Sequence, residues 1–254
     1  GAGSASGGIN TDAIAAAAAA SRAMSDKFLA DYNASHPNQP PTMTAAQLPP
    51  AVQADIDSRR PLRLNLGGGE RPLPGYYLLD LVDLPGVDIQ ADLNQPLHLL
   101  PDGSVEAVHC RHLLEHIDRL LPLLEELHRV VRPGGQIDIR VPHFSNPYGY
   151  SDPTHVRFFG LYSFFYFAAP EHQPKRKVPA FYSRCRFQVG DIHIRLMHKT
   201  WFERIIRAVL QPLINLSPQW QDWYERRLCR LFPANEIQYR ITPVASSTAT
   251  AKAA

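Results

Sequence analysis

Short apolar runs alternate with polar turns between residues 62 and 141 of this 254-residue chain. Each run is bounded by glycine, proline or aspartate, which is typical of strands. Residues 119–131 instead carry apolar side chains at helical spacing and stop at the sequence RPGG (132–135), which ends helices. The predicted strands are LRLNL (62–66), YYLLD (76–80), VDIQADL (87–93), VEAVHC (105–110) and QIDIRV (136–141).

Strand, helix and strand in succession imply parallel strands joined by crossovers, so the pattern predicts an α/β sheet. In such sheets ligands bind at the carboxyl ends of the strands, where the strand order reverses. The side chains that directly follow the predicted strands are therefore the first candidates for a binding site.

Three glycines, Gly67 to Gly69, follow the first predicted strand. A tight turn, or a backbone that approaches a ligand closely, favours glycine, although three glycines also occur in ordinary loops. Asp80 ends the second strand and favours a binding site, because a carboxylate there can accept hydrogen bonds from both hydroxyls of a ribose. Asp83 competes for this role, and an aspartate that begins a solvated turn is the alternative. Asp92 and Leu93 end the third strand, where they can meet an adenine amino group and ring.

The composition, 44% hydrophobic and 20% charged, is sufficient for one good-sized core. The formal net charge of +2 gives no reason to expect nucleic acid as a partner. Cys110, Cys185 and Cys229 lie far apart in the sequence, which argues against a disulfide framework and a thiolate zinc site and favours a reducing, cytoplasmic location. No apolar run reaches the ~18 residues that a membrane span needs.

Several stretches together resemble the class I S-adenosylmethionine-dependent methyltransferases. They are LNLGGG (64–69), the strand-end Asp80, ADL (91–93), DGSVEAVHCRHLLEHI (102–117) and ELHRVVRPGGQIDIRVP (126–142). The resemblance implies a Rossmann-like, doubly wound, mostly parallel sheet with an antiparallel last strand and a helical or loop cap. It also implies S-adenosylmethionine as cofactor, with S-adenosylhomocysteine as product.

The resemblance assigns cofactor roles to the strand-end residues. Gly67 and Gly69 approach the cofactor, with Gly68 and Asn65 in the same turn, and Asp80 holds the ribose. Asp92 and Leu93 flank the adenine, and Arg111 and His112 lie near the methionine end. Family members usually have an acidic residue where Asn65 stands and another small residue in place of Gly68. Asn65 can still hydrogen-bond a cofactor amine or the backbone of the turn.

Only ten residues separate Gly69 from Asp80, so the first helix of the family is shortened or absent. A compact subgroup among sugar- and polysaccharide-modifying enzymes is similar in this respect. Residues 143–167, HFSNPYGYSDPTHVRFFGLYSFFYF, resemble its substrate-side insertion, and residues 224–241 resemble its C-terminal segment. We therefore expect a flexible or helical extension over 1–49, a methyltransferase domain over 50–245 with an insertion or cap at about 143–200, and a disordered tail over 246–254.

Methyl transfer is an in-line displacement, so the protein mainly positions the two reactants, and a hydroxyl or amine nucleophile benefits from a base of near-neutral pKa. His143 and His155 are the candidate bases. His143 directly follows the fifth predicted strand, and His155 lies in the insertion that should cover the site. Asp152, three residues before His155, can orient its imidazole. The alternative for Asp152 is a capped turn in which it holds backbone N–H groups.

The sequence predicts no metal site. His112-Leu113-Leu114-Glu115-His116 matches the H-x-x-E-H pattern of one zinc-protease class, but it follows a strand of a nucleotide-binding sheet. A divalent ion held by His143, Asp152, His155 or His193 is an alternative that the spacing does not require. The basic residues Lys175, Arg176, Lys177, Arg184 and Arg186 are expected to be solvated or to bind a phosphate.

The predicted function is O-methylation of a sugar, glycan or sugar nucleotide. The alternatives are a small-molecule methyltransferase of secondary metabolism and a non-catalytic scaffold that binds the cofactor and acts through protein contacts. The acceptor is expected to be a small molecule or glycan and not nucleic acid, because the basic residues form no extended stripe. Residues 200–216 form an amphipathic basic helix that packs on the sheet or, as the alternative, contacts a membrane surface.

Overall fold

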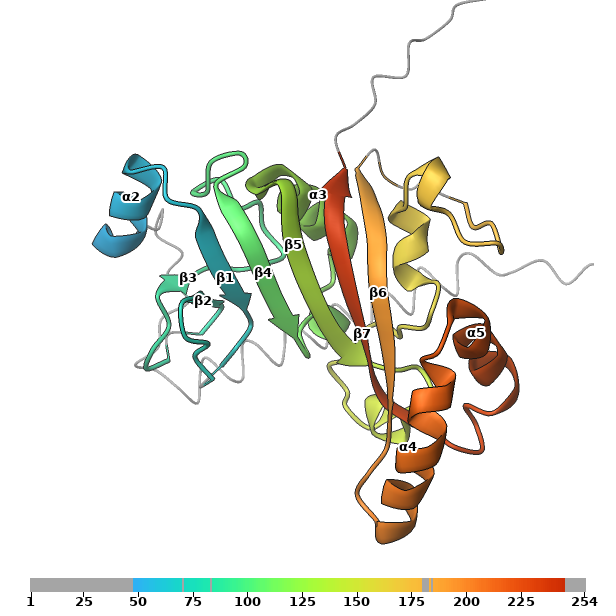
Figure 1. The fold of residues 1–254 in the computed structure, drawn as a ribbon. Coiled ribbons are helices and arrows are strands. Elements are labelled where there is room, and N and C mark those ends of the chain that lie inside the picture. The colour runs from blue at the N-terminus through green and yellow to red at the C-terminus, as the bar shows by residue number, and fades with distance from the viewer. Residues whose placement is uncertain (1–47, 70, 83, 180–182, 184, 245–254) are drawn as a thin grey trace, which may run out of the picture. The chain divides into compact units, whose positions relative to one another are not determined.

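The computed structural model describes residues 48–69, 71–82, 84–179, 183 and 185–244 (Figure 1). The predicted extension, apart from its last two residues, and the predicted tail lie outside the described residues, as do Asp83 and Arg184.

Seven strands of the described chain form a single sheet in the order β3-β2-β1-β4-β5-β7-β6. Strands β1 to β5 pair in parallel, and β7 runs antiparallel to both of its neighbours. This arrangement confirms the predicted fold class, a mostly parallel sheet with an antiparallel last strand. The strands are β1 Leu62–Leu66, β2 Tyr77–Asp80, β3 Ile89–Gln90, β4 Val105–Arg111, β5 Val131–Pro142, β6 Arg186–Leu196 and β7 Ala234–Val244.

The predicted helix over 119–131 is α3, Leu120–Val130, and its buried residues recur at the expected helical spacing. Helix α4, Trp201–Ile214, begins with a capping box in which Thr200 and Glu203 satisfy each other's backbone N–H groups. Helices α2, Pro50–Asp57, and α5, Pro218–Arg227, complete the longer helices of the described residues. The short 3-10 segments are η1 Leu114–His116, η2 Pro147–Tyr150, η3 Ser163–Phe167 and η4 Pro170–His172. None of the described helices is long and apolar enough to cross a membrane.

The two faces of the sheet differ in polarity. On β5, Ile137, Ile139 and Val141 are buried in the main core, which also contains the inward face of α3. The residues that alternate with them, Asp138 and Arg140, belong to the opposite, polar face. A hollow of about 240 Å³ on this face lies outside the predicted cofactor residues and is lined by residues that include His109, Asp138, Arg140, His193, Gln238 and Arg240.

Strand β6 differs from the predicted insertion or cap at about 143–200, because residues 186–196 pair with β7 in the sheet. Its sequence, RFQVGDIHIRL, alternates apolar and polar residues, but the alternation shifts by one residue at Gly190 and Asp191, where the pairing with β7 is also irregular. Main-chain groups of Ile192, Ile194 and Leu196 on the free edge of β6 are satisfied by amide side chains. Asn215 accepts from Ile194 N–H (2.8 Å), and Gln221 Nε2 donates to Ile192 O (2.6 Å). This edge therefore anchors the α4–α5 connection.

Strand β3 is also shorter than predicted, with two paired residues out of the predicted seven. Asp92 Oδ1 accepts the backbone N–H of Asn94 at 2.8 Å. This hydrogen bond is typical of an aspartate turn, which ends the extended segment before it can pair further.

Candidate functional site

Strands β1, β4 and β5 end at the same edge of the sheet, the lower edge in Figure 1. The glycine turn follows β1, Arg111 and His112 lie at the end of β4, and the predicted insertion begins after β5. The topology therefore brings the predicted candidates to the carboxyl edge, where ligands bind in α/β sheets.

The glycine turn contains two residues with positive φ, Gly67 at 61° and Gly69 at 55°. A Cβ atom on Gly67 would lie 2.7 Å from a Leu113 methyl carbon, and a Cβ on Gly68 would lie 2.4 Å from Asn65 Nδ2. A Cβ on Gly69 would instead point into open space. Gly67 and Gly68 are thus required by packing, whereas Gly69 is favoured by its positive φ alone.

Asp80 contacts this turn directly. Its Oδ2 accepts the backbone N–H of Gly69 at 3.0 Å, and its Oδ1 accepts that of Val82 at 3.2 Å. Each carboxylate oxygen has a second lone pair, and the side chain is only partly buried, so both oxygens can still accept hydroxyl hydrogen bonds. Asn65 braces the same turn from the inside, because its buried Nδ2 donates to Arg71 O at 3.1 Å.

Leu93 differs from the predicted arrangement. It is buried in the main core, so its side chain already packs against protein. Asp92, beside it, keeps one carboxylate oxygen outside its hydrogen bond to Asn94. Of this pair, Asp92 is the residue that stays accessible to a ligand.

His112 lies between two buried carboxylates at the end of β4. Its backbone has a φ of 51°, which is rare for a residue with a side chain. Its Nδ1 lies 3.2 Å from Glu115 Oε1 and its Nε2 lies 3.3 Å from Glu236 Oε2. Hydrogen bonds to Glu115 and then Glu236 raise the pKa of His112 to about 9, so its ring is cationic at neutral pH.

Glu236, on β7, is surrounded by the cationic side chains of His112, Arg140 on β5 and Arg195 on β6. Burial alone would raise its pKa, but the hydrogen bond from His112 and the nearby Arg140 and Arg195 outweigh burial and lower the pKa to about 2. Arg195 and Arg140 place nitrogens 3.4 and 3.7 Å from Glu236 Oε1. Arg111 is exposed and has no ion pair among the described residues, which leaves its guanidinium available to an anionic ligand.

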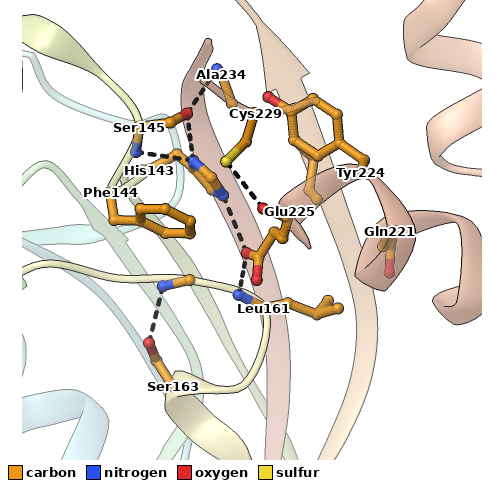
Figure 2. Close-up of polar contacts among 12 residues, drawn as sticks. His143, Phe144, Ser145, Leu161, Ser163, Gln221, Tyr224, Glu225, Cys229 and Ala234 are labelled. Atoms are coloured by element: carbon orange, nitrogen blue, oxygen red, sulfur yellow. Dashed lines mark hydrogen bonds and ion pairs between the residues drawn. The ribbon is translucent and has the colours of Figure 1, made fainter. Parts of the chain in front are cut away.

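His143 is enclosed in a complete hydrogen-bond network (Figure 2). The residue is 1% exposed, its Nε2 lies 3.0 Å from Glu225 Oε1, and its Nδ1 lies 2.8 Å from Ser145 Oγ. The backbone N–H of Ser145 donates to His143 Nδ1 at 3.1 Å, so Nδ1 is an acceptor. The Ser145 hydroxyl therefore donates to Nδ1 and accepts the N–H of Ala234 at 3.0 Å. The network joins the end of β5 to α5 and β7. This geometry favours a structural role for His143 over the predicted role as a base.

Asp152 caps a turn, which was the alternative to its role as an orienting carboxylate. Its Oδ1 accepts both the backbone N–H (2.9 Å) and the hydroxyl (2.6 Å) of Thr154, and these hydrogen bonds lower its pKa. Its Oδ2 lies 3.7 Å from His155 Nε2. The structure therefore brings Asp152 and His155 together without a tight hydrogen bond between them.

His155 lies beside two residues that follow β4. One ligand atom each from Glu115, His116 and His155 lie within 4.8 Å of one another, and the rings of His116 and His155 meet edge to face with centroids 4.7 Å apart. The backbone N–H of Val156 donates to Glu115 O at 2.9 Å, which holds the two segments together. Sequence reasoning missed this cluster, although the H-x-x-E-H pattern contained Glu115 and His116.

A family model described as a methyltransferase domain matches residues 79–139, from the end of β2 into β5. The resemblance to class I S-adenosylmethionine-dependent methyltransferases is thereby confirmed. The cofactor of this domain is S-adenosylmethionine. No curated protein matches the chain.

Solved structures similar to the chain come from several organisms. One is a SAM-dependent methyltransferase from Archaeoglobus fulgidus, with 19% identity and a TM-score of 0.43 over 76% of this chain and 91% of that one. Another is the YcgJ protein from Bacillus subtilis, with 14% identity and a TM-score of 0.42 over 76% and 97%. A third is a phosphoethanolamine N-methyltransferase from Haemonchus contortus, solved with S-adenosylhomocysteine, with 14% identity and a TM-score of 0.40 over 76% and 52%. At these scores the likenesses carry no argument about function.

Proposed function

We propose that this domain transfers a methyl group from S-adenosylmethionine to a hydroxyl of a sugar, glycan or sugar nucleotide. The observation that carries the cofactor half is the contact between Gly69 N–H and the Asp80 carboxylate, in a segment that continues into the matched methyltransferase domain. The acceptor half is supported by the resemblance of residues 143–167 and 224–241 to sugar- and polysaccharide-modifying enzymes.

In this proposal the carboxyl edge holds the cofactor along the strand ends. Asp80 accepts the ribose hydroxyls, and Asp92 accepts from the adenine amino group. The backbone at Gly67 and Gly69 approaches the cofactor, while Asn65 and Gly68 keep the turn in shape. Arg111 pairs with the methionine carboxylate, next to the cationic ring of His112.

His155 is the proposed base for the acceptor hydroxyl. Its Nδ1 lies 2.8 Å from the carbonyl oxygen of Gly149, which accepts only, so Nδ1 carries the proton and Nε2 carries the lone pair. When the acceptor oxygen attacks the methyl carbon, the C–O bond forms, the S–CH₃ bond breaks, and Nε2 takes the hydroxyl proton. Asp152 keeps the turn that holds Thr154 and His155.

We also propose a cytoplasmic setting, because Cys110, Cys185 and Cys229 are free thiols in the structure. Buried free cysteines are common where the environment is reducing.

A screen with tritium-labelled methyl donor over sugar nucleotides, glycans and phenols tests the proposal. We expect label in a sugar-containing acceptor, and we expect His155→Ala to lower turnover roughly 100-fold or more while cofactor binding persists. The matched control is His193→Ala, an exposed histidine on β6. Label only in phenols would assign the domain to small-molecule methylation, and cofactor binding without any transfer would leave a scaffold role. Full turnover by His155→Ala would remove it as the base.

A further inference from the structure

We propose that Glu115, His116 and His155 form a binding site for one divalent transition-metal ion. Glu115 and His116 lie in η1, directly after β4, and His155 lies in the segment after η2. The three ligand atoms lie within 4.8 Å of one another, so small side-chain rotations bring them to the spacing of a bound ion.

Both histidines have one ring nitrogen, Nε2, that the hydrogen bond of the other nitrogen leaves unprotonated. His155 Nδ1 donates to Gly149 O at 2.8 Å, which leaves the lone pair on Nε2. His116 Nδ1 lies 2.8 Å from Thr154 Oγ1, whose own proton goes to Asp152, so Nδ1 of His116 must be the donor. Its lone pair is therefore also on Nε2. Metal-binding histidines are typically oriented in this way, with the second ring nitrogen donating to an oxygen.

Glu115 supplies an independent observation. The residue is 1% exposed, and its Oε2 has no hydrogen-bond partner in the part of the chain that the structure describes. Burying such an oxygen without a partner costs free energy, and native proteins rarely leave one in this state without a reason. Its other oxygen, Oε1, lies 3.2 Å from His112 Nδ1, so Oε2 is the oxygen available to a bound cation.

The ligand chemistry indicates which ion fits. Two imidazole nitrogens and one carboxylate oxygen suit zinc, iron, cobalt or manganese, whereas magnesium prefers oxygen ligands and retains several waters. Three protein ligands leave at least one coordination position open for water or substrate. Asp152 Oδ2, 3.7 Å from His155 Nε2, is near enough to serve as a further ligand or to hydrogen-bond a bound water.

If the domain transfers a methyl group as proposed above, the ion can activate the acceptor hydroxyl. An acceptor hydroxyl bound to the ion has a lowered pKa and loses its proton to water, so that its oxygen attacks the methyl carbon as an alkoxide. His155 then acts as a ligand, and the base described above is not needed. The C–O bond forms as the S–CH₃ bond breaks, as before.

Calorimetry on the chelator-treated full chain tests the site with zinc and, separately, with magnesium. We expect one zinc ion per chain and far weaker binding of magnesium. His116→Ala, His155→Ala and Glu115→Gln should each weaken zinc binding by about 100-fold or more, and Thr154→Val by about 10- to 100-fold. His193→Ala, the matched control, should bind zinc like the wild type. Circular dichroism verifies the fold of every variant, and Glu115→Gln, which retains the size of the side chain, guards against a variant that fails to fold.

Absence of zinc binding, or binding that the three ligand variants leave unchanged, would overturn the site. Cobalt gives a second readout, since its visible absorption reports nitrogen and oxygen ligands directly. Turnover that survives chelation would overturn the role of the ion in the reaction. S-adenosylhomocysteine binding, measured on the metal-free chain, separates the two hypotheses: if it persists while zinc does not bind, only the metal site fails.

A different observation concerns the outer surface of α4 and α5. The chain has three tryptophans, and all are exposed on these helices: Trp201 is 73%, Trp220 45% and Trp223 41% exposed. Phe202, Ile205, Val209, Leu213 and Leu216 are also exposed along α4 and just beyond it. On the helical wheel of α4 these residues share one side, opposite to the buried Ile214.

We infer that this surface, the α4–α5 surface, binds an anionic lipid bilayer. Residues 198–231 contain six lysines and arginines and three acidic residues, which gives a net charge of +3, compared with +2 for the whole chain. Exposed tryptophan and apolar residues with a basic surround are typical of helices that lie in a membrane interface. Helix α4 extends beyond the carboxyl edge of the sheet (Figure 1), so the lipid would lie at the end of the molecule that carries the proposed site.

Co-sedimentation with vesicles of phosphatidylcholine, alone or mixed with phosphatidylglycerol, tests this surface. We expect binding to the anionic vesicles and a blue shift of tryptophan emission. The double variant Ile205→Asp, Val209→Asp should lose binding at least about tenfold, and Arg227→Gln with Arg230→Gln roughly fivefold per charge. Leu121→Asp, at an exposed leucine of α3, is the matched control. No binding to either vesicle, or a dimer that the aspartate variants dissociate, would overturn the proposal.

Discussion

Two histidine clusters lie at the carboxyl edge of the sheet, one after β5 and one after β4, and they differ in the partners of their ring nitrogens. In the first cluster, both nitrogens of His143 have protein partners, Ser145 and Glu225. In the second cluster, Nδ1 of His116 and Nδ1 of His155 each have a protein hydrogen-bond partner, and Nε2 of each ring keeps its lone pair. Each cluster contains histidine, a carboxylate and a hydroxyl, so composition alone does not distinguish them.

The difference shows that unsatisfied hydrogen-bonding capacity indicates a ligand site better than residue composition does. The carboxylate of the first cluster, Glu225, accepts from His143 and from Leu161 N–H. That of the second, Glu115, has a buried oxygen without a partner among the described residues. The first cluster therefore holds elements together, whereas the second is complete only with a ligand.

The largest expected effect is a contrast in stability between the two histidines. His143→Ala leaves Glu225 and Ser145 without their partner in a buried place, so we expect the free energy of unfolding to fall by about 3 kcal/mol. His155→Ala should cost less than about 1 kcal/mol, because its removal leaves no comparable buried network. Urea unfolding at pH 7 measures both. Equal losses would break the comparison.

A smaller effect concerns the second partner of His112, Glu236. Its folded-state pKa, about 2, is below its ordinary value of 4.5. A lowered pKa stabilises the fold above pH 4.5, and this contribution is lost as the pH falls toward 2. We expect the wild type to lose about 2 kcal/mol relative to Glu236→Gln over this window. Unfolding free energies of the two proteins, measured side by side, check this. Parallel pH curves would contradict the ion-pair account of Glu236.

The smallest effect is expected for the two hydroxyls. Ser145→Ala removes the acceptor of Ala234 N–H and a donor to His143, so we expect a loss of about 1–2 kcal/mol in the free energy of unfolding. Thr154→Val should cost less stability, because its hydrogen bond to Asp152 is exposed, and should act instead on ligand binding at His116. Thermal unfolding of Ser145→Ala and Thr154→Val measures the two stability losses, and zinc titration of both variants measures their ligand binding. A reversed order of stability losses would refute it.

The parts of the fold with strong periodicity could be predicted from the sequence. Helix α3 and strands β1 and β4 follow their apolar patterns closely, because each buries a whole stripe or face. Strand β6 could not be predicted in this way, since its alternation of apolar and polar residues is interrupted at Gly190 and Asp191 and its edge is satisfied by the amide side chains of Asn215 and Gln221. Tertiary hydrogen bonds of that kind leave no periodic signal.

The site was predictable only where its residues are neighbours in sequence. Asp152, Thr154 and His155 form one local turn, and the glycine turn meets Asp80 across two adjacent parallel strands. Glu115 and His155 are forty residues apart, and Glu225 is 82 residues from His143, so the sheet has to form before either pair can meet. The H-x-x-E-H pattern therefore pairs Glu115 and His116 with His112, which the structure places in ion pairs with Glu115 and Glu236. The histidine that lies beside Glu115 and His116 is His155.

The central claim is that the glycine turn and Asp80 bind the nucleoside part of S-adenosylmethionine. Calorimetry with S-adenosylhomocysteine on the wild type and on Asp80→Ala tests it most directly, with Asp102→Ala as the control at an exposed aspartate in the turn before β4. We predict micromolar-range binding by the wild type and the control, and a loss of about 1.5–3 kcal/mol in Asp80→Ala. Equal affinity of all three proteins, or no binding by the wild type, would contradict the account.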